Sequence, residues 1–211
     1  MRAGVIRAAL AGGSLLALAA VGAGAADAPA PGPTGLPTGL RPPAAFAGIA
    51  DPGQRAVALF REAGRVIRGP RCVNCHPAGD RPLQGDDGHP HEPWVRRGAD
   101  GHGVAGLRCT TCHHDANFAP AGVPGHPHWG LAPRSMAWQG QSLGAICRQI
   151  KDPARNGGRS VAAVVDHMAG DSLVGWAWAP GGGRSPAVGT QAELGALLHA
   201  WQDAGAACPP G

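Results

Sequence analysis

The chain has 211 residues and a formal net charge of +4 at pH 7, a length that suits one domain with a tail. Glycine (35) and proline (21) are abundant, large aliphatic residues are scarce, and alanine is the largest part of the 44% hydrophobic fraction. The small charge, with no run of lysine and arginine, argues against nucleic-acid binding. A chain this poor in large apolar side chains needs disulfides or cofactors to stabilise a core.

The first 25 residues have the three parts of an export signal. Arg2 and Arg7 precede a short apolar stretch that ends near Val21, and the small residues Ala23-Gly24-Ala25 form a cleavage motif. An uncleaved membrane anchor is the alternative, but the apolar part is short and rich in alanine and glycine. We expect cleavage near Ala25, which gives a periplasmic protein without a membrane span.

The mature chain is expected to begin with a flexible segment. Residues 26–50 are rich in proline, glycine and alanine, a composition typical of a linker outside the folded domain. Asp51-Pro52, an N-cap followed by proline at the first helical position, predicts a helix that ends before Gly69-Pro70. Residues 70–141 have no sustained helical or strand period, so we expect irregular backbone there.

Three more helices are expected in the second half of the chain. Serine N-caps predict short helices at 142–150 and 160–168. After a loop at 171–189, the capping box at 190–193 predicts a last helix with its apolar residues on one face. No segment shows convincing strand alternation, so the fold class is all-α with extensive irregular loops, in one domain of residues 51–209.

Two short motifs carry the functional interpretation. Cys72-Val73-Asn74-Cys75-His76 and Cys109-Thr110-Thr111-Cys112-His113 both match C-x-x-C-H, the attachment sequence of c-type haem. Two thiols at this spacing reach the two vinyl groups of one porphyrin, and the adjacent imidazole then binds the iron. The sequence therefore predicts two covalently bound haem c groups, with His76 and His113 as proximal ligands, in a small dihaem cytochrome c-like domain.

The two motifs belong to a longer repeat. Gly-x-Arg-Cys-x-x-Cys-His, followed after twelve residues by His-Pro-His, runs from Gly69 to His91 and again from Gly106 to His128, offset by 37. Twelve extended residues span up to about 40 Å, enough to return a ligand to the opposite face of a haem. The repeat predicts a local binding unit for each haem.

A structural zinc site with four thiolates is the alternative interpretation of paired Cys-x-x-Cys motifs. The histidine after each second cysteine and the export signal argue against it, because free thiolates outside the cytoplasm are prone to oxidation. A thioredoxin-like redox motif is disfavoured, because no βαβ pattern surrounds either pair.

Cys147 and Cys208 lie outside the two motifs. Two further cysteines in an exported protein indicate a disulfide, with two unpaired buried thiols as the alternative. The bond would close a loop of about 60 residues and tie the last helix to the helix at 142–150.

The distal iron ligands are the least constrained. The repeat favours the His-Pro-His segments, and alternate side chains of an extended segment point to opposite sides, so one histidine of each pair can face its own iron. We expect these to be His91 and His128, because each is near a tryptophan, Trp94 or Trp129, that is expected to cover a haem face. Met136 is the main rival at the second haem. The other rivals are His89, His126, His102, His114, His167 and Met168.

Several longer stretches point to a known family. They are Pro82-Leu83-Gln84-Gly85-Asp86-Asp87 with His89-Pro90-His91 after the first motif, Lys151-Asp152-Pro153-Ala154-Arg155-Asn156-Gly157-Gly158-Arg159, and Leu173-Val174-Gly175-Trp176. With these stretches the chain, over about residues 55–209, resembles a bacterial family of exported dihaem proteins labelled "isoquinoline 1-oxidoreductase subunit".

The resemblance implies a cytochrome that accepts electrons from a molybdenum hydroxylase acting on N-heterocycles or aldehydes. A respiratory-chain cytochrome would be the acceptor. Nothing in the sequence suits molybdopterin binding or hydroxylation, so we expect an electron-transfer subunit and not an enzyme. A haem enzyme or sensor with one open iron, such as a small peroxidase, is the alternative.

Overall fold

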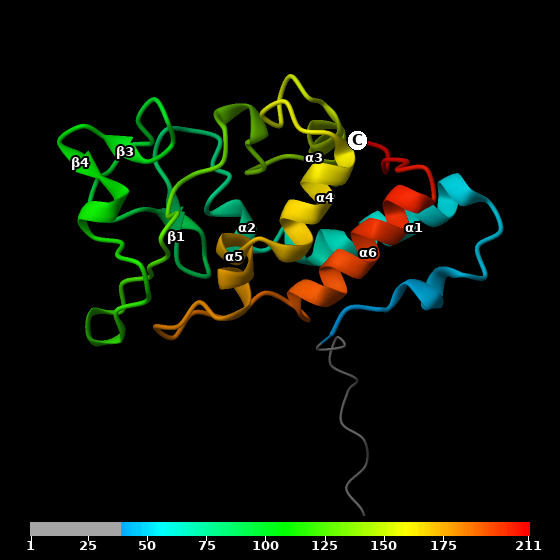
Figure 1. The fold of residues 1–211 in the computed structure, drawn as a ribbon, viewed down its shortest axis with the longest axis horizontal. Coiled ribbons are helices and arrows are strands. Elements are labelled where there is room, and N and C mark those ends of the chain that lie inside the picture. The colour runs from blue at the N-terminus through cyan, green and yellow to red at the C-terminus, as the bar shows by residue number, and fades with distance from the viewer. Residues whose placement is uncertain (1–38) are drawn as a thin grey trace, which may run out of the picture. The chain divides into compact units, whose positions relative to one another are not determined.

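The computed structural model describes residues 39–211, so the expected signal at 1–25 lies outside the described residues. Within the described range the chain is mostly helical with much irregular backbone, as predicted (Figure 1). It has six α-helices, five short 3-10 helices and two hairpins with two residues in each strand. None of the described helices is both long and apolar enough to cross a membrane.

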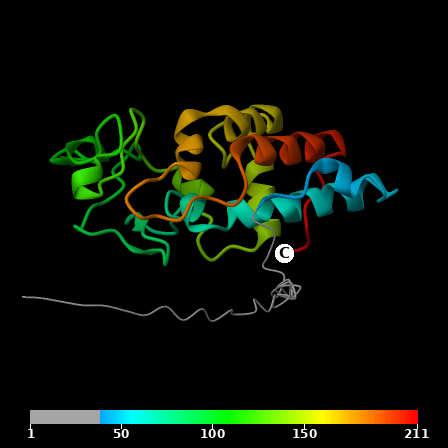
Figure 2. The same ribbon diagram turned by 90° about the horizontal axis from the view of Figure 1, so that it is seen from below.

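Four helices form a packed body, in which α6 runs along α1 (Figures 1 and 2). They are α1 (Pro52–Ile67), α3 (Leu143–Lys151), α4 (Val161–Gly170) and α6 (Gln191–Asp203). Each begins at its predicted cap, because the side chains of Asp51, Ser142, Ser160 and Thr190 accept backbone N–H groups of the first turn. Glu193 completes the predicted capping box by accepting the Thr190 N–H at 2.8 Å.

The apolar core lies between these helices. Trp201 of α6 and Phe60 of α1 are fully buried, with ring centroids 4.9 Å apart. Aliphatic side chains surround them, including Leu59, Ile67, Ile146, Ile150, Val165, Leu194, Leu197 and Leu198. The helical body therefore has a core of its own, although large apolar residues are scarce in the chain.

Residues 39–50, expected to end the linker, pack against this core. The short 3-10 helix η1 (Pro43–Phe46) buries Phe46, and Leu40 is buried beside it. Arg65 of α1 also donates to the Gly39 carbonyl at 2.9 Å. Composition identified the proline-rich stretch, but the burial of Leu40 and Phe46 places its end in the fold.

The backbone between α1 and α3 is irregular, as predicted for residues 70–141. It contains the helix α2 (Pro70–Val73) and the 3-10 helices η2 (Cys109–Thr111), η3 (Ala119–Ala121) and η4 (Arg134–Met136). Its antiparallel hairpins pair β1 (Leu83–Gln84) with β2 (His89–Pro90), and β3 (Gly103–Val104) with β4 (Leu107–Arg108). Such strands are too short for sequence alternation to reveal.

The loop expected at 171–189 begins with two short helices. Asp171 accepts the N–H groups of Leu173 and Val174 and so starts α5 (Ser172–Gly175). The 3-10 helix η5 (Trp176–Trp178) follows directly. The glycine- and proline-rich composition of residues 171–189 predicted a loop, and the capped turn at its start was not predicted.

The loop-rich segment, residues 68–135, buries a single apolar side chain, that of Pro77; no other aliphatic or aromatic side chain is buried between Ile67 and Met136. Arginine side chains bonded to backbone carbonyls hold it together. Arg71 donates to Gly85 at 2.7 Å, Arg81 to His91 at 2.7 and 2.9 Å, and Arg108 to Gly103 at 3.0 Å. Such charge-assisted hydrogen bonds are stronger than neutral ones.

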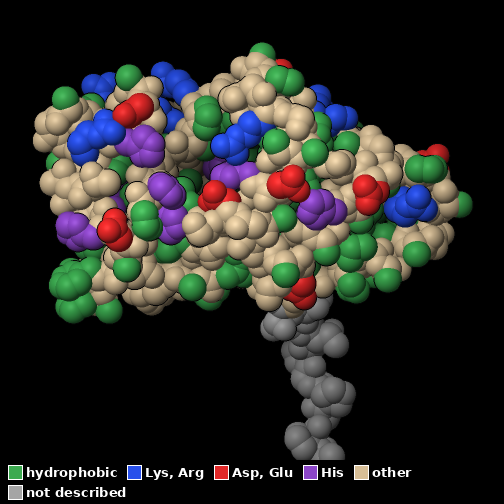
Figure 3. Space-filling model, viewed as in Figure 1, with side chains coloured by type: hydrophobic (Ala, Val, Ile, Leu, Met, Phe, Trp, Pro, Cys, Tyr) green, Lys and Arg blue, Asp and Glu red, His purple; other side chains and the backbone are tan. Residues whose placement is uncertain are grey.

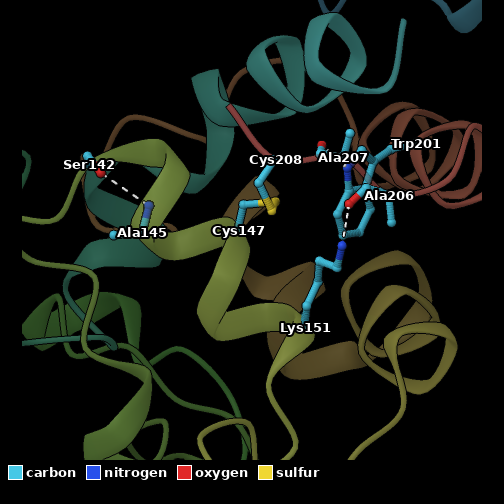
Figure 4. The surroundings of a disulfide bond; sticks show 8 residues. All are labelled: Ser142, Ala145, Cys147, Lys151, Trp201, Ala206, Ala207 and Cys208. Atoms are coloured by element: carbon cyan, nitrogen blue, oxygen red, sulfur yellow. Dashed lines mark hydrogen bonds between the residues drawn. A yellow bond between two sulfur atoms is a disulfide. The ribbon is translucent and has the colours of Figure 1, made fainter. Parts of the chain in front are cut away.

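Cys147 of α3 is bonded to Cys208, which follows α6, so the predicted disulfide is confirmed (Figure 4). Two side chains hold the same C-terminal tail. Lys151 Nζ donates to the Ala206 carbonyl at 2.7 Å, and Trp201 Nε1 donates to the Ala207 carbonyl at 2.9 Å. The disulfide thus links α3 to a tail that is already positioned against α6.

Replacing both Cys147 and Cys208 by alanine is expected to lower the free energy of unfolding by about 2–4 kcal/mol, because the unfolded chain is no longer closed into a long loop. Thermal unfolding of the variant against oxidised wild type measures the change, with reduced wild type as the matched control. Rapid alkylation of both thiols in native, non-reduced wild type would contradict the bond.

Candidate functional site

Each Cys-x-x-Cys-His motif forms a helical turn. The Cys75 N–H donates to the Cys72 carbonyl at 3.1 Å, and the Cys112 N–H donates to the Cys109 carbonyl at 3.2 Å. Positions i, i+3 and i+4 of a helical turn lie on one face. Each motif therefore presents two thiols and an imidazole to the same side.

The histidine of each motif is held in place through one of its ring nitrogens, Nδ1. His76 Nδ1 is 2.6 Å from the Met136 carbonyl oxygen, and His113 Nδ1 is 2.7 Å from that of Pro124. A carbonyl only accepts hydrogen bonds, so Nδ1 carries the proton and Nε2 of the neutral ring keeps its lone pair. This is how a metal-binding histidine is oriented by its surroundings.

A tryptophan covers one face of each of these rings. Trp138 is stacked on His76 with centroids 3.6 Å apart, and Trp129 is stacked on His113 at 4.8 Å. Stacking restricts the plane of the imidazole without using its nitrogen edge. Trp94, expected to cover a haem face, is instead exposed, with the Arg81 guanidinium 4.5 Å from its ring.

Both histidines are neutral at pH 7. Burial lowers the pKa of His76 to about 4; the bond to Met136 opposes this shift, and the positive charges of Arg97 and His167 add to it. Burial likewise lowers the pKa of His113, with the bond to Pro124 again opposing. Neutral imidazole is the form that binds a metal.

The cysteines of the first motif are thiols, not thiolates. Burial raises the pKa of Cys72 to about 12 and that of Cys75 to about 11, against the opposing charge of Arg71. Neither has the low pKa of a redox-active cysteine. Among residues 39–211 no three His, Cys, Asp or Glu side chains gather as a metal-binding group.

A cavity of about 140 Å³, here called the shared cavity, lies between the two motifs. Cys75 of the first motif lines it together with Cys109, Cys112 and His113 of the second. Apolar side chains make up much of its wall, namely Pro82, Leu83, Pro93, Val95, Leu107, Pro124, Trp129, Leu131 and Trp176. Histidine side chains gather mainly on the loop-rich side of the face in Figure 3.

All charged lining residues of the shared cavity are arginines: Arg71, Arg96, Arg97, Arg108 and Arg184. Arg71 and Arg97 are themselves buried, and the Nε of both and Nη2 of Arg97 have no hydrogen-bond partner within residues 39–211. Burial and the nearby Arg134 also lower the pKa of Arg97, partly offset by Asp80. Arg71 Nη2 is paired with Asp86 at 2.6 Å, so the unpaired groups are single N–H groups of the two guanidiniums. Unpaired buried N–H groups are costly, so this lining favours an anionic ligand.

His91 is the one expected distal ligand that lines the shared cavity. Its ring centroid is 5.8 Å from that of His113, at an interplanar angle of 65°. The repeat had suggested that each His-Pro-His segment serves the haem of its own repeat. The structure instead places His91, from the first repeat, against His113 of the second motif.

The other histidines of these segments have partners elsewhere. His128 is exposed, and its backbone N–H donates to His126 Nδ1 at 3.1 Å. His126 Nε2 is 3.0 Å from Ser172 Oγ. His89 is exposed, with Nδ1 2.6 Å from Asp87 and Nε2 2.9 Å from Gln84.

The remaining rivals lie outside the shared cavity. Met136 is buried in the core, and its carbonyl serves His76 of the first motif, not the second. Met168 is buried in α4, and His114 is exposed. His167 of α4, 3.4 Å from Asp171, is near enough to His76 to influence its pKa. His102 Nδ1 contacts the Trp129 carbonyl at 3.1 Å.

Comparisons with known proteins add no relative: no family model, curated protein or solved structure matches this chain. The site is therefore interpreted from its own residues. The sequence had placed Arg71 in the repeat without giving it a role, and no local pattern singled out Arg97 or Trp138.

Replacing Arg97 by alanine is expected to lower the free energy of unfolding by about 1–3 kcal/mol, because the Ala132 carbonyl loses its donor. The neighbouring Arg96→Ala is the matched control: the Arg96 side chain is 62% exposed, whereas Arg97 is 6% exposed. Chemical unfolding measures both, and hydrogen exchange locates the change in residues 97–132. Equal effects of the two variants would show that burial of Arg97 is unimportant.

Proposed function

We propose that this chain is a periplasmic electron-transfer protein with two covalently bound c-type haems, in a small cytochrome c-like domain. The observation that carries the proposal is the pair of Cys-x-x-Cys-His turns. Each turn presents two thiols and a histidine whose Nδ1 is bonded to a backbone carbonyl. Few chemistries other than haem attachment use this combination twice in one chain.

The residues present fit the proposed cofactor. Cys72 with Cys75, and Cys109 with Cys112, would form the thioether bonds, and Nε2 of His76 and His113 would face the irons. The unpaired N–H groups of Arg71 and Arg97 suit the propionate carboxylates of a porphyrin. A bound haem c supplies one-electron oxidation and reduction.

The packing of the loop-rich segment supports the same proposal. Residues 68–135 bury only one apolar side chain of their own, that of Pro77, although they contain both motifs. A porphyrin held in the shared cavity would give Leu83, Val95, Leu107 and Leu131 an apolar partner. Haem attachment is then coupled to the folding of this segment, while the helical body folds on its own core.

The partners are proposed from the family resemblance. A molybdenum-hydroxylase-type enzyme would donate electrons, and a respiratory-chain cytochrome would accept them. In this role the chain is a subunit that carries electrons and does not act on the substrate. Electron-transfer encounters of this kind are typically small and short-lived.

Intact mass under denaturing conditions tests the cofactor. Protein matured in the periplasm is expected to carry two haem additions, and Cys72→Ala/Cys75→Ala is expected to carry one, because one pair of thioether bonds is lost. Cys147→Ala/Cys208→Ala, which leaves both motifs intact, is the control and keeps two. A mass equal to the bare mature chain would refute haem attachment.

Stopped-flow absorbance at the haem bands tests the role. The protein is expected to be reduced by a hydroxylase encoded beside it once that enzyme's N-heterocycle or aldehyde is added, and to be inert to the substrate alone. Slow reduction by that hydroxylase and fast reduction by an unrelated donor would reject the partner. Strong carbon monoxide binding by the reduced wild type would favour the alternative enzyme or sensor.

A further inference from the structure

We infer that the two haem sites are interlocked: His91, from the first repeat, is the distal ligand of the haem attached to the second motif. This inference rests on the proposed function and adds the ligand pairing to it. The iron bound by His113 would thus take its sixth ligand from a segment 22 positions upstream in the chain, and not from the His-Pro-His segment of its own repeat.

The distance between the two rings suits a shared iron. Histidine nitrogens lie about 2 Å from a bound transition metal, so imidazoles on opposite sides of one iron have ring centroids on the order of 6 Å apart. The centroids of His91 and His113 are 5.8 Å apart. Both residues line the shared cavity together with the attachment cysteines Cys109 and Cys112.

The ring nitrogens of His91 and His113 also suit a shared iron. His91 Nδ1 is 3.1 Å from the Pro93 carbonyl oxygen, so this nitrogen carries the proton, as it does in His113. With the proton on Nδ1, Nε2 is the nitrogen of each ring that is available to bind a metal. Among the four histidines of the two His-Pro-His segments, His91 alone combines a place in the cavity with this arrangement.

The backbone of His91 is fixed from both sides. Its N–H donates to the Pro82 carbonyl at 2.9 Å, next to the β1–β2 hairpin. Its carbonyl accepts two hydrogen bonds from Arg81, whose guanidinium also pairs with Glu92 at 2.6 Å. The hairpin and its arginine therefore hold His91 beside the second motif before any ligand binds.

The test uses the full-length, periplasmically matured protein and counts low-spin haems by electron paramagnetic resonance and absorbance. His91→Ala is expected to convert one of the two haems to a high-spin form. His128→Ala, the equivalent position of the second repeat, is the matched control and is expected to keep the wild-type spectrum. A His91→Ala variant that retains the wild-type spectrum would overturn the inference.

A double variant tells which iron His91 binds. If His91 and His113 share one iron, His91→Ala/His113→Ala disturbs no more haem than either single variant, because both changes fall on the same site. If they bind different irons, the double variant loses both low-spin signals, and the inference is wrong.

A single-haem variant gives the same answer independently. In Cys72→Ala/Cys75→Ala, which keeps only the second haem, His91→Ala is expected to make all remaining haem high-spin. Continued low-spin haem there overturns the pairing. These outcomes differ from failure of the proposed function, in which wild-type protein contains no haem at all.

Discussion

Hydrogen bonds from arginine side chains to backbone carbonyls hold the part of the chain on which every proposed function depends. Residues 68–135 contain both Cys-x-x-Cys-His turns and bury only one apolar side chain, that of Pro77. Apart from the contacts of the first motif with the core, the hydrophobic effect therefore contributes little to their order. Arg71, Arg81 and Arg97 each fix a carbonyl that is remote in sequence. Arg71 and Arg97 also line the cavity between the motifs, and their unpaired N–H groups give the cavity its preference for anions.

The two motifs form similar turns, but different residues hold their histidines in place. His76 donates to Met136 and stacks on Trp138, and both of these residues belong to the helical core. His113 donates to Pro124, and its partner Trp129 lies edge-on to Trp176 at 4.9 Å. The first site is thus an extension of the core, which a disulfide further braces, whereas the second is held by loops. Sequence identity between the repeats hides this difference, because the supporting residues lie outside the repeated positions.

The contrast between local and remote contacts decides what the sequence could predict. Helix starts at Asp51, Ser142, Ser160 and Thr190 were predictable because a cap acts within one turn of its own position. The Cys-x-x-Cys-His motifs were recognisable for a similar reason, because their residues are adjacent in the sequence. The position of His91 beside His113 could not be predicted. It depends on the β1–β2 hairpin and on the hydrogen bonds of Arg81, neither of which produces a periodic pattern in the sequence. The buried ends of Arg71 and Arg97 were equally hidden, because arginine is ordinarily a surface residue.

The proposed ligand pairing also completes the account of the loop-rich segment. His91 and His113 are held by separate sets of hydrogen bonds, one around Arg81 and one around Pro124. A single iron between them would join these two sets by bonds stronger than any hydrogen bond in the segment. The ring nitrogens suit such an iron without rearrangement, because each Nδ1 is already hydrogen-bonded to a carbonyl and each Nε2 is left for the metal. The second haem would then be the structural centre that residues 68–135 otherwise lack, and electron transfer would use a site whose rigidity comes from the cofactor itself.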